Sequence, residues 1–256
     1  MRIVINGARG RMGRMVVEAA AGCPDVEVAG LLERPGHPDA GWQVGTAAGP
    51  MAVATDPASV TGPVDVGIDF STPDSAVAFA RAMAARGAAV LCGTTGLGEQ
   101  HLAALEEVGR DVAVLWTPNT SIGVHCLHEL AARATAMLGS GYDVEVVELH
   151  HRHKRDAPSG TALSLARRVS EAAGGGEVVV SRDGQCGPRP QGEIGVLAIR
   201  GGEVVGEHTV LFLGDHDRIE ITHRASSREA LANGAIALAR RLVGRHPGMC
   251  RVGEVL

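Results

Sequence analysis

The fold is decided near the start of the chain, by the stretch Arg2-Ile3-Val4-Ile5-Asn6-Gly7-Ala8-Arg9-Gly10-Arg11-Met12-Gly13. Its apolar first part predicts a buried strand, and the glycines that follow predict a tight turn into a helix over residues 11–21. Glycine lets the backbone of such a turn approach a pyrophosphate closely, and the first N–H groups of a helix attract an anion. The spacing is Gly-x-x-Gly-x-x-Gly, in which Ala8 departs from the more usual Gly-x-Gly-x-x-Gly pattern. The motif therefore indicates a dinucleotide site, with a purely structural strand–turn–helix corner as the alternative.

The same alternation of strand and helix continues through the first half of the chain. We expect further strands over residues 26–32, 65–70, 88–92 and 112–116, with helices over 71–86 and 99–108. Strands that alternate with helices form right-handed βαβ units, and such units assemble a parallel sheet. The first part of the chain is therefore predicted to be a Rossmann-like α/β dinucleotide-binding domain.

Several loops at the carboxyl ends of these strands are placed to contact a dinucleotide, because ligands of open parallel sheets bind there. The loops contain Gly7, Ala8, Arg9, Gly10, Arg11 and Met12, then Gly93, Thr94 and Thr95, and finally Thr117, Pro118, Asn119 and Thr120. After the second strand, Glu33 is placed to accept hydrogen bonds from the ribose of NADH, and Arg34 is placed to pair with the 2′-phosphate of NADPH. Both residues together predict use of NADH or NADPH, unless they form only a surface ion pair.

The pattern changes after about residue 121. A helix over 123–138, a strand over 142–149 and a helix over 160–173 precede strand-like runs at 177–181, 195–200, 207–214 and 217–223, and a last helix covers 227–243. Gly201-Gly202 is a typical turn between two such runs, which predicts a mostly antiparallel sheet with hairpins. An α+β domain is therefore expected to follow the first domain.

Composition excludes several classes of protein. With 256 residues and a net charge of −5, the chain lacks the basic stripe of a nucleic-acid-binding protein. It has no apolar run of the ~18–20 residues that a membrane span needs, and its first residues lack the pattern of a signal peptide. Its five cysteines are widely spaced without a Cys-x-x-Cys pair. This spacing predicts free thiols in the cytoplasm rather than disulfides or a zinc site.

The densest chemistry lies in the stretch Glu148-Leu149-His150-His151-Arg152-His153-Lys154-Arg155-Asp156-Ala157-Pro158-Ser159-Gly160-Thr161. Such concentrated positive charge predicts an anionic substrate, and the amides of Gly160 and Thr161 at a helix start predict a site for a carboxylate. Lys154 is the only lysine in a chain with 23 arginines. An amine can release its proton where a guanidinium cannot, and neighbouring cations disfavour its charged form. Lys154 is therefore predicted to donate a proton, with a histidine as relay.

Other interpretations of this stretch remain open at this point. His150, His151 and His153 could bind a transition metal in a metal-dependent hydrolase, although their spacing converges poorly and the nearby cations repel a metal ion. A dinucleotide-sensing regulator is a second alternative, but it has no use for a proton donor. Six further histidines are interpreted as structural or surface residues, namely His125, His128, His208, His216, His223 and His246.

These segments together resemble the 4-hydroxy-tetrahydrodipicolinate reductase family over essentially the whole chain. The resemblance rests on residues 7–13, 33–38, 93–96 and 148–161, and it continues through 206–210 and 218–225. It implies a cytoplasmic, metal-free enzyme that reduces a cyclic dicarboxylate with NADH or NADPH, on the route to diaminopimelate and lysine. It also implies a homotetramer that assembles through the sheet of the second domain.

By position, the resemblance implies a role for each motif. His150 corresponds to the family's acid/base residue, Lys154 to its proton donor and His151 to a substrate contact, while Gly160 and Thr161 correspond to carboxylate-binding residues. The loop residues named above, with Glu33 and Arg34, correspond to cofactor contacts. The family's last helix returns to the nucleotide domain, which implies domains of residues 1–121 plus 227–256 and of residues 122–226.

Two positions depart from the family. Thr120 stands where phenylalanine is common, which removes an aromatic ring from the nicotinamide loop, and Cys250 stands where tyrosine is usual. The implied mechanism is hydride transfer to C4 of the ring after its 4-hydroxyl is lost as water, followed by protonation by Lys154 with His150. Closure of the domains about hinges near Ser121 and Ser226 is expected to accompany substrate binding.

Overall fold

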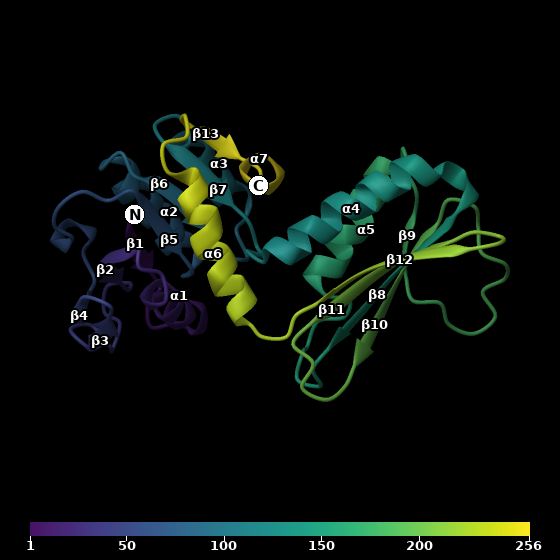
Figure 1. Cartoon of the computed structure of the whole chain (residues 1–256), viewed down its shortest axis with the longest axis horizontal. Helices are drawn as coiled ribbons and strands as arrows, with labels where there is room; N and C mark the ends of the chain where they lie inside the picture. Colours follow the sequence, from purple (N-terminus) through teal and green to yellow (C-terminus); the bar gives the residue numbers. More distant parts are fainter. The chain divides into compact units, whose positions relative to one another are not determined.

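The computed structural model describes all residues from Met1 to Leu256, and the chain divides into two compact units. One unit contains Met1–Ser121 together with Glu229–Leu256, and the other contains Ile122–Arg228. The C-terminal segment of the chain therefore belongs with its first half (Figure 1).

The first unit is built on an eight-stranded sheet with the strand order β13-β7-β6-β5-β1-β2-β4-β3. Its strands are β1 (Arg2–Asn6), β2 (Glu27–Leu32), β3 (Gln43–Thr46), β4 (Gly49–Ala54), β5 (Val66–Asp69), β6 (Ala89–Cys92), β7 (Ala113–Trp116) and β13 (Gly248–Cys250). All neighbours run parallel except β3 and β4, which form an antiparallel pair at one edge. The predicted Rossmann-like sheet is confirmed, and β2 and β5 flank β1, so the strand order reverses there, where open sheets bind ligands.

The sequence patterns did not predict three strands of this sheet. β3 and β4 are short, expose alternate residues and contain Gly45, Gly49 and Pro50, which sequence patterns assign to turns. β13 has only three residues and pairs with β7 through its backbone. Strands this short form because a neighbouring strand offers hydrogen-bonding partners, and their own residues carry little signal.

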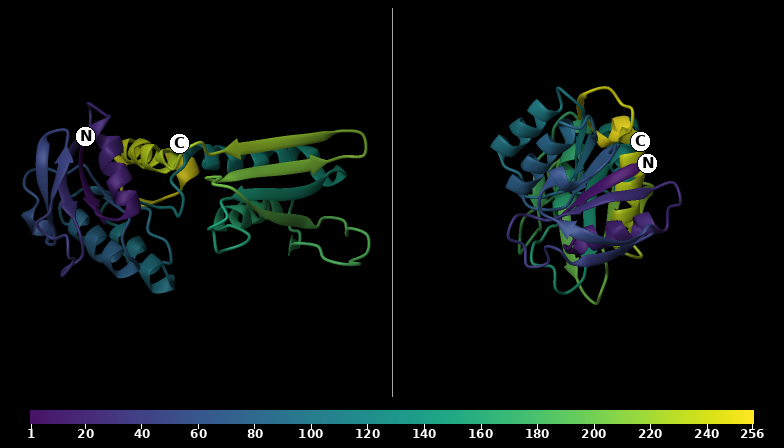
Figure 2. Two further views of the ribbon diagram at one scale, coloured as in Figure 1. Left: turned by 90° about the horizontal axis from the view of Figure 1, so that it is seen from below. Right: turned by 90° about the vertical axis from the view of Figure 1, so that its left-hand side faces the viewer.

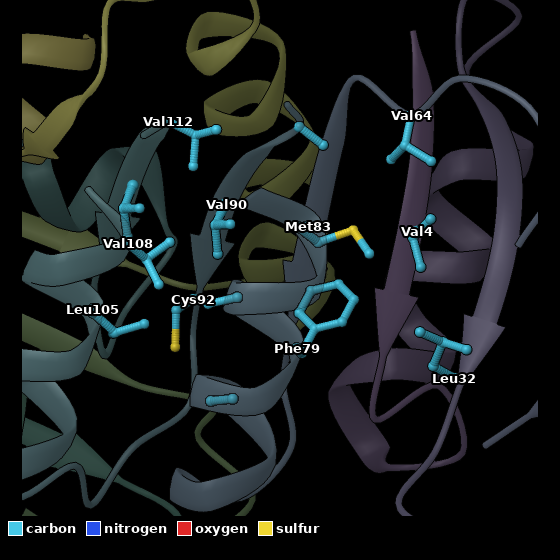
Figure 3. Close-up of a cluster of buried hydrophobic side chains, with 14 of the residues drawn as sticks. Val4, Leu32, Val64, Phe79, Met83, Val90, Cys92, Leu105, Val108 and Val112 are labelled. Carbon is cyan, nitrogen blue, oxygen red and sulfur yellow. The ribbon is translucent and has the colours of Figure 1, made fainter. Parts of the chain in front are cut away.

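Helices cover both faces of this sheet. They are α1 (Arg11–Ala21), α2 (Pro73–Ala84), α3 (Glu99–Val108), α6 (Glu229–Leu242) and the short α7 (Val252–Val255), with a 3-10 turn η1 (Pro57–Ser59). On one face, Phe79 and Met83 of α2 and Leu105 of α3 pack in a core with strand residues such as Val90 (Figure 3). On the face opposite α2 and α3, α1 and α6 pack together (Figure 2). Helices can cover both faces because successive strand residues point to opposite sides of the sheet.

The second unit is an α+β fold on a five-stranded sheet in the order β12-β11-β8-β10-β9. Its strands are β8 (Asp143–His150), β9 (Val178–Val180), β10 (Ile194–Arg200), β11 (Glu207–Leu213) and β12 (Arg218–Arg224), and its helices are α4 (Ile122–Leu138) and α5 (Gly160–Ala172), with a 3-10 turn η2 (Gly139–Gly141). Both helices pack on one face, where Leu127, Leu165 and Phe212 belong to the core. The predicted α+β class is confirmed. Neither unit contains a helix with the length and apolar character that a membrane span requires.

The strand pairing of the second sheet differs in part from expectation. β11 runs antiparallel to β8 and β12, as expected, whereas β10 runs parallel to β8 and β9. The hairpin expected at Gly201-Gly202 is wrong, because β8 lies between β10 and β11. The parallel pairing sets Arg200 opposite His150 at the carboxyl ends of the two strands. Sequence patterns do not show this arrangement, since a hairpin and a crossing loop of this length carry the same turn residues.

The other face of this sheet carries apolar side chains that neither α4 nor α5 covers. Leu197 and Ile199 of β10 are 38% and 50% exposed, and Leu213 of β11 is 36% exposed. They alternate with Val196 and Phe212, which are fully buried on the helix-covered face. An exposed apolar patch of this kind marks an interaction surface.

The packing of α6 provides a test of the fold. A Cβ on Gly234 would lie 2.0 Å from the backbone carbonyl oxygen of Thr120. Alanine usually stabilises a helix interior by about 1 kcal/mol relative to glycine, but here the helix would have to move away from the loop. We therefore expect Gly234→Ala to lower the free energy of unfolding in urea, by roughly 1–3 kcal/mol. The control is Gly45→Ala, whose Cβ meets nothing within 4 Å, and equal stability of the two variants would contradict the close packing.

Candidate functional site

The turn after β1 has the geometry that its glycines predict. Gly7 has a φ of +75°, and its N–H donates to the carbonyl oxygen of Leu32 at 2.9 Å. A Cβ on Gly7 would lie 2.3 Å from the carbonyl oxygen of Phe70, and one on Gly13 would lie 2.1 Å from the carbonyl oxygen of Gly7. The turn is therefore packed on both sides, and side chains at these positions are excluded.

The N-terminus of α1 opens beside this turn. Its N-cap is Gly10, which has no side chain to bind the first N–H groups, and the first turn contains no acidic residue. A cavity of about 310 Å³ lies here, and its lining includes Arg11, Met12, Gly93, Thr94, Thr95, Pro118 and Thr120. The structure thus brings together residues from three of the predicted loops. The glycine turn and the uncapped helix start fit a pyrophosphate, which needs a close backbone and free N–H groups.

Behind the loop at Gly93–Thr95 lies a buried carboxylate that sequence reasoning missed. Asp69 ends β5 and is fully buried. Its Oδ1 accepts from Asn6 Nδ2 at 2.7 Å and Ser71 Oγ at 2.6 Å, and its Oδ2 accepts from Thr94 Oγ1 at 2.5 Å. Burial raises the pKa of Asp69, and the hydrogen bonds act in the opposite direction. The available signal was an acidic residue in the last position of an otherwise apolar strand.

Glu33 and Arg34 follow β2 and line a second cavity, of about 600 Å³. The Glu33 carboxylate is largely buried, and its Oε1 accepts the N–H of Arg9 at 2.9 Å. Its Oε2 lies 3.8 Å from His37 Nε2, while Arg34 is exposed. Glu33 is therefore held in place by the glycine turn itself, and the guanidinium of Arg34 stays available.

The side chain of Arg9 has partners that sequence reasoning also missed. Its Nε donates to Asp39 Oδ2 at 2.7 Å, and its guanidinium carbon lies 5.4 Å from the centre of the Trp42 ring. Both partners come from the segment between β2 and β3. Arg9 therefore holds Glu33 with its backbone and anchors that segment with its side chain.

The loop after β7 is fixed by its own hydrogen bonds and by α6. Thr117 Oγ1 donates to the carbonyl oxygen of Asn119 at 2.7 Å, and Asn119 Oδ1 accepts the N–H of Ser121 at 2.9 Å. Thr120 is buried, and its Oγ1 donates to the carbonyl oxygen of Leu231 at 2.6 Å. Thr120 therefore ties this loop to α6.

In the second unit, the predicted chemical residues lie between the end of β8 and the start of α5. His150 is the last residue of β8, and its Nδ1 lies 2.5 Å from Glu148 Oε2. Glu148 is fully buried and also accepts the N–H of Ser159 at 2.9 Å. Arg200, opposite on β10, donates to both oxygens of Glu148, at 2.7 and 2.8 Å. A bidentate ion pair therefore lies directly beside the predicted acid/base residue.

The environment of His150 keeps its ring neutral. Burial lowers the pKa of His150, and the charges of Lys154 and Arg200 act in the same direction, whereas Glu148 opposes them. The ring packs edge-on against His208, with 5.2 Å between the ring centres. Burial also lowers the pKa of His208, to about 4, and its Nε2 lies 3.1 Å from Ser159 Oγ. Both rings are therefore neutral at pH 7.

Lys154 has a partner on its own loop. Its side chain is 21% exposed, and its Nζ lies 2.9 Å from Asp156 Oδ1. The Lys154 ammonium holds the pKa of Asp156 below its usual range. Lys154 therefore has a counter-ion on its own loop in addition to the neighbouring cations.

The three neighbouring histidines turn to different partners. His151 Nε2 lies 3.2 Å from Arg228 Nη2, and His153 Nε2 lies 3.3 Å from Glu203 Oε1, while His150 contacts Glu148. Since a guanidinium can only donate, Nε2 of His151 accepts and its hydrogen sits on Nδ1. That Nδ1 is buried and has no hydrogen-bond partner in the structure. His151 therefore offers one unused donor.

The start of α5 provides a second set of donors. Ser159 is the N-cap, and its Oγ accepts the N–H of Ala162 at 3.1 Å. The first turn, which begins with Gly160 and Thr161, contains no acidic residue. A Cβ on Gly160 would meet nothing within 4 Å, so there is open space beside the helix start. The N-terminus of this 13-residue helix can therefore accommodate a carboxylate.

Sequence reasoning missed four residues that organise this site. It assigned no role to Glu148, Ser159 and Arg200, and it interpreted His208 as a structural or surface residue, whereas His208 packs on His150 and contacts Ser159. A signal existed for Glu148, because it lies two and four positions after Val146 and Val144 on β8 and therefore shares their core-facing side of the strand. An ionisable residue in a buried position of a strand is a candidate for a functional site. No comparable signal marks Arg200, whose place depends on the parallel pairing of β10.

Two family models match the chain. The N-terminal domain of dihydrodipicolinate reductase matches residues 1–120, and the C-terminal domain of dihydrodipicolinate reductase matches residues 123–256. Curated proteins named 4-hydroxy-tetrahydrodipicolinate reductase from Anaeromyxobacter dehalogenans (strain 2CP-1) and Myxococcus xanthus are 45% and 44% identical to this chain. The alignments cover 100% of this chain and 97% of each relative.

Solved structures share the fold. The dipicolinate-bound dihydrodipicolinate reductase from Paenisporosarcina sp. TG-14 has a TM-score of 0.76 at 21% identity, covering 98% of this chain and 97% of that chain. The DAP dehydrogenase of C. glutamicum has a TM-score of 0.58 at 18% identity, covering 100% of this chain and 95% of that chain. At these identities the solved structures show only that the fold is shared, whereas the sequence matches show the family. The chain belongs to the dihydrodipicolinate reductase family.

Proposed function

We propose that this protein reduces 4-hydroxy-tetrahydrodipicolinate to tetrahydrodipicolinate with NADH or NADPH, with loss of water from the ring. One observation carries the proposal, namely that a relative bearing this enzyme's name is 45% identical over the whole chain. The region after β8 supports it, because it combines an amine with donors suited to an anionic substrate. Such a reaction serves the diaminopimelate route to lysine, and the proposed location of the protein is the cytoplasm.

The first unit is proposed to be the dinucleotide-binding domain, over residues 1–121 plus 227–256. The turn at residues 7–12 and the start of α1 would hold the pyrophosphate, and the loops at 93–95 and 117–120 would line the nicotinamide end. Glu33 offers an acceptor to ribose hydroxyls, and Arg34 offers a guanidinium to a 2′-phosphate, which supports use of either cofactor. When bound, the reduced nicotinamide supplies a hydride to the substrate ring.

The second unit is proposed to bind the substrate and to assemble the protein, over residues 122–226. The N–H groups of Gly160 and Thr161 would receive one carboxylate, and His151 is the proposed contact for another polar group of the substrate. Lys154 is the proposed proton donor to the reduced ring. His150 is the proposed acid/base residue, and its neutral ring can accept a proton.

The exposed face of the second sheet supports a homotetramer. Leu197, Ile199 and Leu213 are at least one-third exposed on a face that no helix of the unit covers. The homotetramer implied by the resemblance would bury this face against other copies of the chain. The area removed from water would then stabilise the assembly.

A coupled assay tests the proposed reaction. The substrate is made in place from pyruvate and aspartate semialdehyde, and the absorbance of the reduced nicotinamide is followed with NADH and NADPH in separate reactions. We expect both cofactors to be consumed in a substrate-dependent manner, because Glu33 and Arg34 serve different ribose groups. Binding of either cofactor without any substrate-dependent absorbance loss would instead indicate a dinucleotide-sensing protein.

Substitution of the proton-transfer residues tests their roles. We expect Lys154→Ala and His150→Ala each to lower kcat by roughly 10²–10⁴-fold, the usual contribution of general acid–base catalysis. Lys154→Arg should fail as well, because a guanidinium does not release its proton at working pH. The affinity for NADH, measured by fluorescence titration, should stay the same in all three variants. An active Lys154→Arg enzyme would show that Lys154 is not the donor.

A charge on the exposed sheet face tests the assembly. We expect Ile199→Lys to break the homotetramer into smaller species in light scattering, because the lysine would have to be buried between copies. The control is Met137→Lys, which changes an apolar residue that is 83% exposed on α4, away from the sheet face. Tetramers in both variants, or smaller species in the unmodified protein, would contradict assembly through this face.

A further inference from the structure

One carboxylate connects two parts of the proposed substrate site. Glu148 is fully buried, and both of its oxygens have two partners each. Oε1 accepts from the N–H of Ser159 at 2.9 Å and from Arg200 Nη2 at 2.7 Å. Oε2 accepts from Arg200 Nη1 at 2.8 Å and lies 2.5 Å from His150 Nδ1. Both oxygens of this carboxylate are occupied by these partners and neither is exposed to solvent. The role of Glu148 is therefore to hold the groups that it contacts.

The charge of Glu148 determines which nitrogen of His150 carries hydrogen. Burial alone would raise the pKa of Glu148, but Arg200, His150 and Ser159 hold it below its usual range. An ionised carboxylate only accepts, so Nδ1 of His150 must donate, and in the neutral ring Nε2 is a bare acceptor. A Cβ on Gly206 would lie 2.9 Å from that Nε2. Glycine at this position keeps a side chain from covering the nitrogen.

The other oxygen of Glu148 reaches the start of α5. Its partner Ser159 is the N-cap of that helix and also lies 3.1 Å from His208, which packs on His150. We propose that Glu148 is a positioning residue of the substrate site: it fixes the tautomer of His150 and, through Ser159, holds the N-terminus of α5 beside that ring. The inference rests on the proposed function and deepens it. The carboxylate itself touches neither substrate nor cofactor.

A purely structural role for Glu148 is the competing explanation, since the ion pair with Arg200 also joins β8 to β10. The chain offers a matched control for it. Glu145 lies on the same strand but on the opposite face of the sheet, is 8% exposed and pairs with Arg182 at 2.8 Å and Arg189 at 3.2 Å, without a histidine. If burial and pairing are all that matter, substitutions at 145 and 148 should behave alike.

The experiment is ¹⁵N NMR of the full-length protein with labelled histidine, combined with kinetics. In the unmodified protein at pH 7.5 we expect His150 to carry hydrogen on Nδ1 only, with its signals assigned by their loss in His150→Gln. Glu148→Gln should give a mixture of tautomers. It should also lower kcat by at least about 10-fold, up to the roughly 10²–10⁴-fold that general acid–base catalysis contributes, with the KM for NADH unchanged. Glu145→Gln should lower the stability and leave the tautomer and kcat unchanged.

A second variant keeps the test decisive. Loss of the carboxylate alone leaves the Arg200 charge without its partner and can prevent folding. The double variant Glu148→Gln/Arg200→Gln removes both charges, and we expect the same mixture of tautomers. Hydrogen on Nε2 in the unmodified protein, or an unchanged tautomer and kcat in a folded variant, would overturn the proposal. The NMR measurement uses no substrate, so an inactive unmodified protein would count against the proposed function alone, and the tautomer would still decide the role of Glu148.

Discussion

The ion pair between the fully buried Glu148 and the partly exposed Arg200 is the interaction on which the proposed substrate site depends. Leaving one member of such a pair buried alone typically costs about 3–5 kcal/mol, so the two side chains fix each other firmly. The pair exists because β10 runs parallel to β8 and sets Arg200 opposite His150. In the hairpin that the turn at 201–202 suggested, β10 would instead have paired with β11. One choice of strand pairing therefore places the ring of His150 and, through Ser159, the start of α5.

The first unit also contains a buried carboxylate, but its hydrogen-bond partners carry no positive charge. Asp69 is as deeply buried as Glu148, but its partners are neutral hydroxyl and amide groups from Asn6, Ser71 and Thr94. The two carboxyl groups therefore differ in pKa. Burial raises the pKa of Asp69, whereas the guanidinium of Arg200 helps to keep the pKa of Glu148 below its usual range. In both units a carboxylate beneath the surface holds a loop that carries the proposed chemistry, and neither carboxylate needs to touch a ligand.

Local signals in the sequence were sufficient for the parts of the fold and site that neighbouring residues determine. The turn at Gly7–Gly13, the first helix and the end of β8 follow from spacing and residue type within a dozen positions. The partners of these elements come from far along the chain: Arg200 is 52 positions from Glu148, and Asp39 is 30 positions from Arg9. Such contacts depend on which strands pair and in what order, which the periodicity within one strand does not encode. The same reason explains β13, a strand defined by its pairing with β7.

The two proposed proton-transfer residues also differ in what they can do at neutral pH. His150 is neutral, because burial and nearby cations lower its pKa, and the contact with Glu148 leaves its Nε2 as an acceptor. Lys154 lies 2.9 Å from Asp156 Oδ1 and is the proposed proton donor. In the proposed reaction the ammonium would protonate the ring, and the imidazole would take up and return protons as the amine is restored. This division is the reason to expect lysine rather than arginine at position 154, since a guanidinium could provide charge but could not complete the transfer.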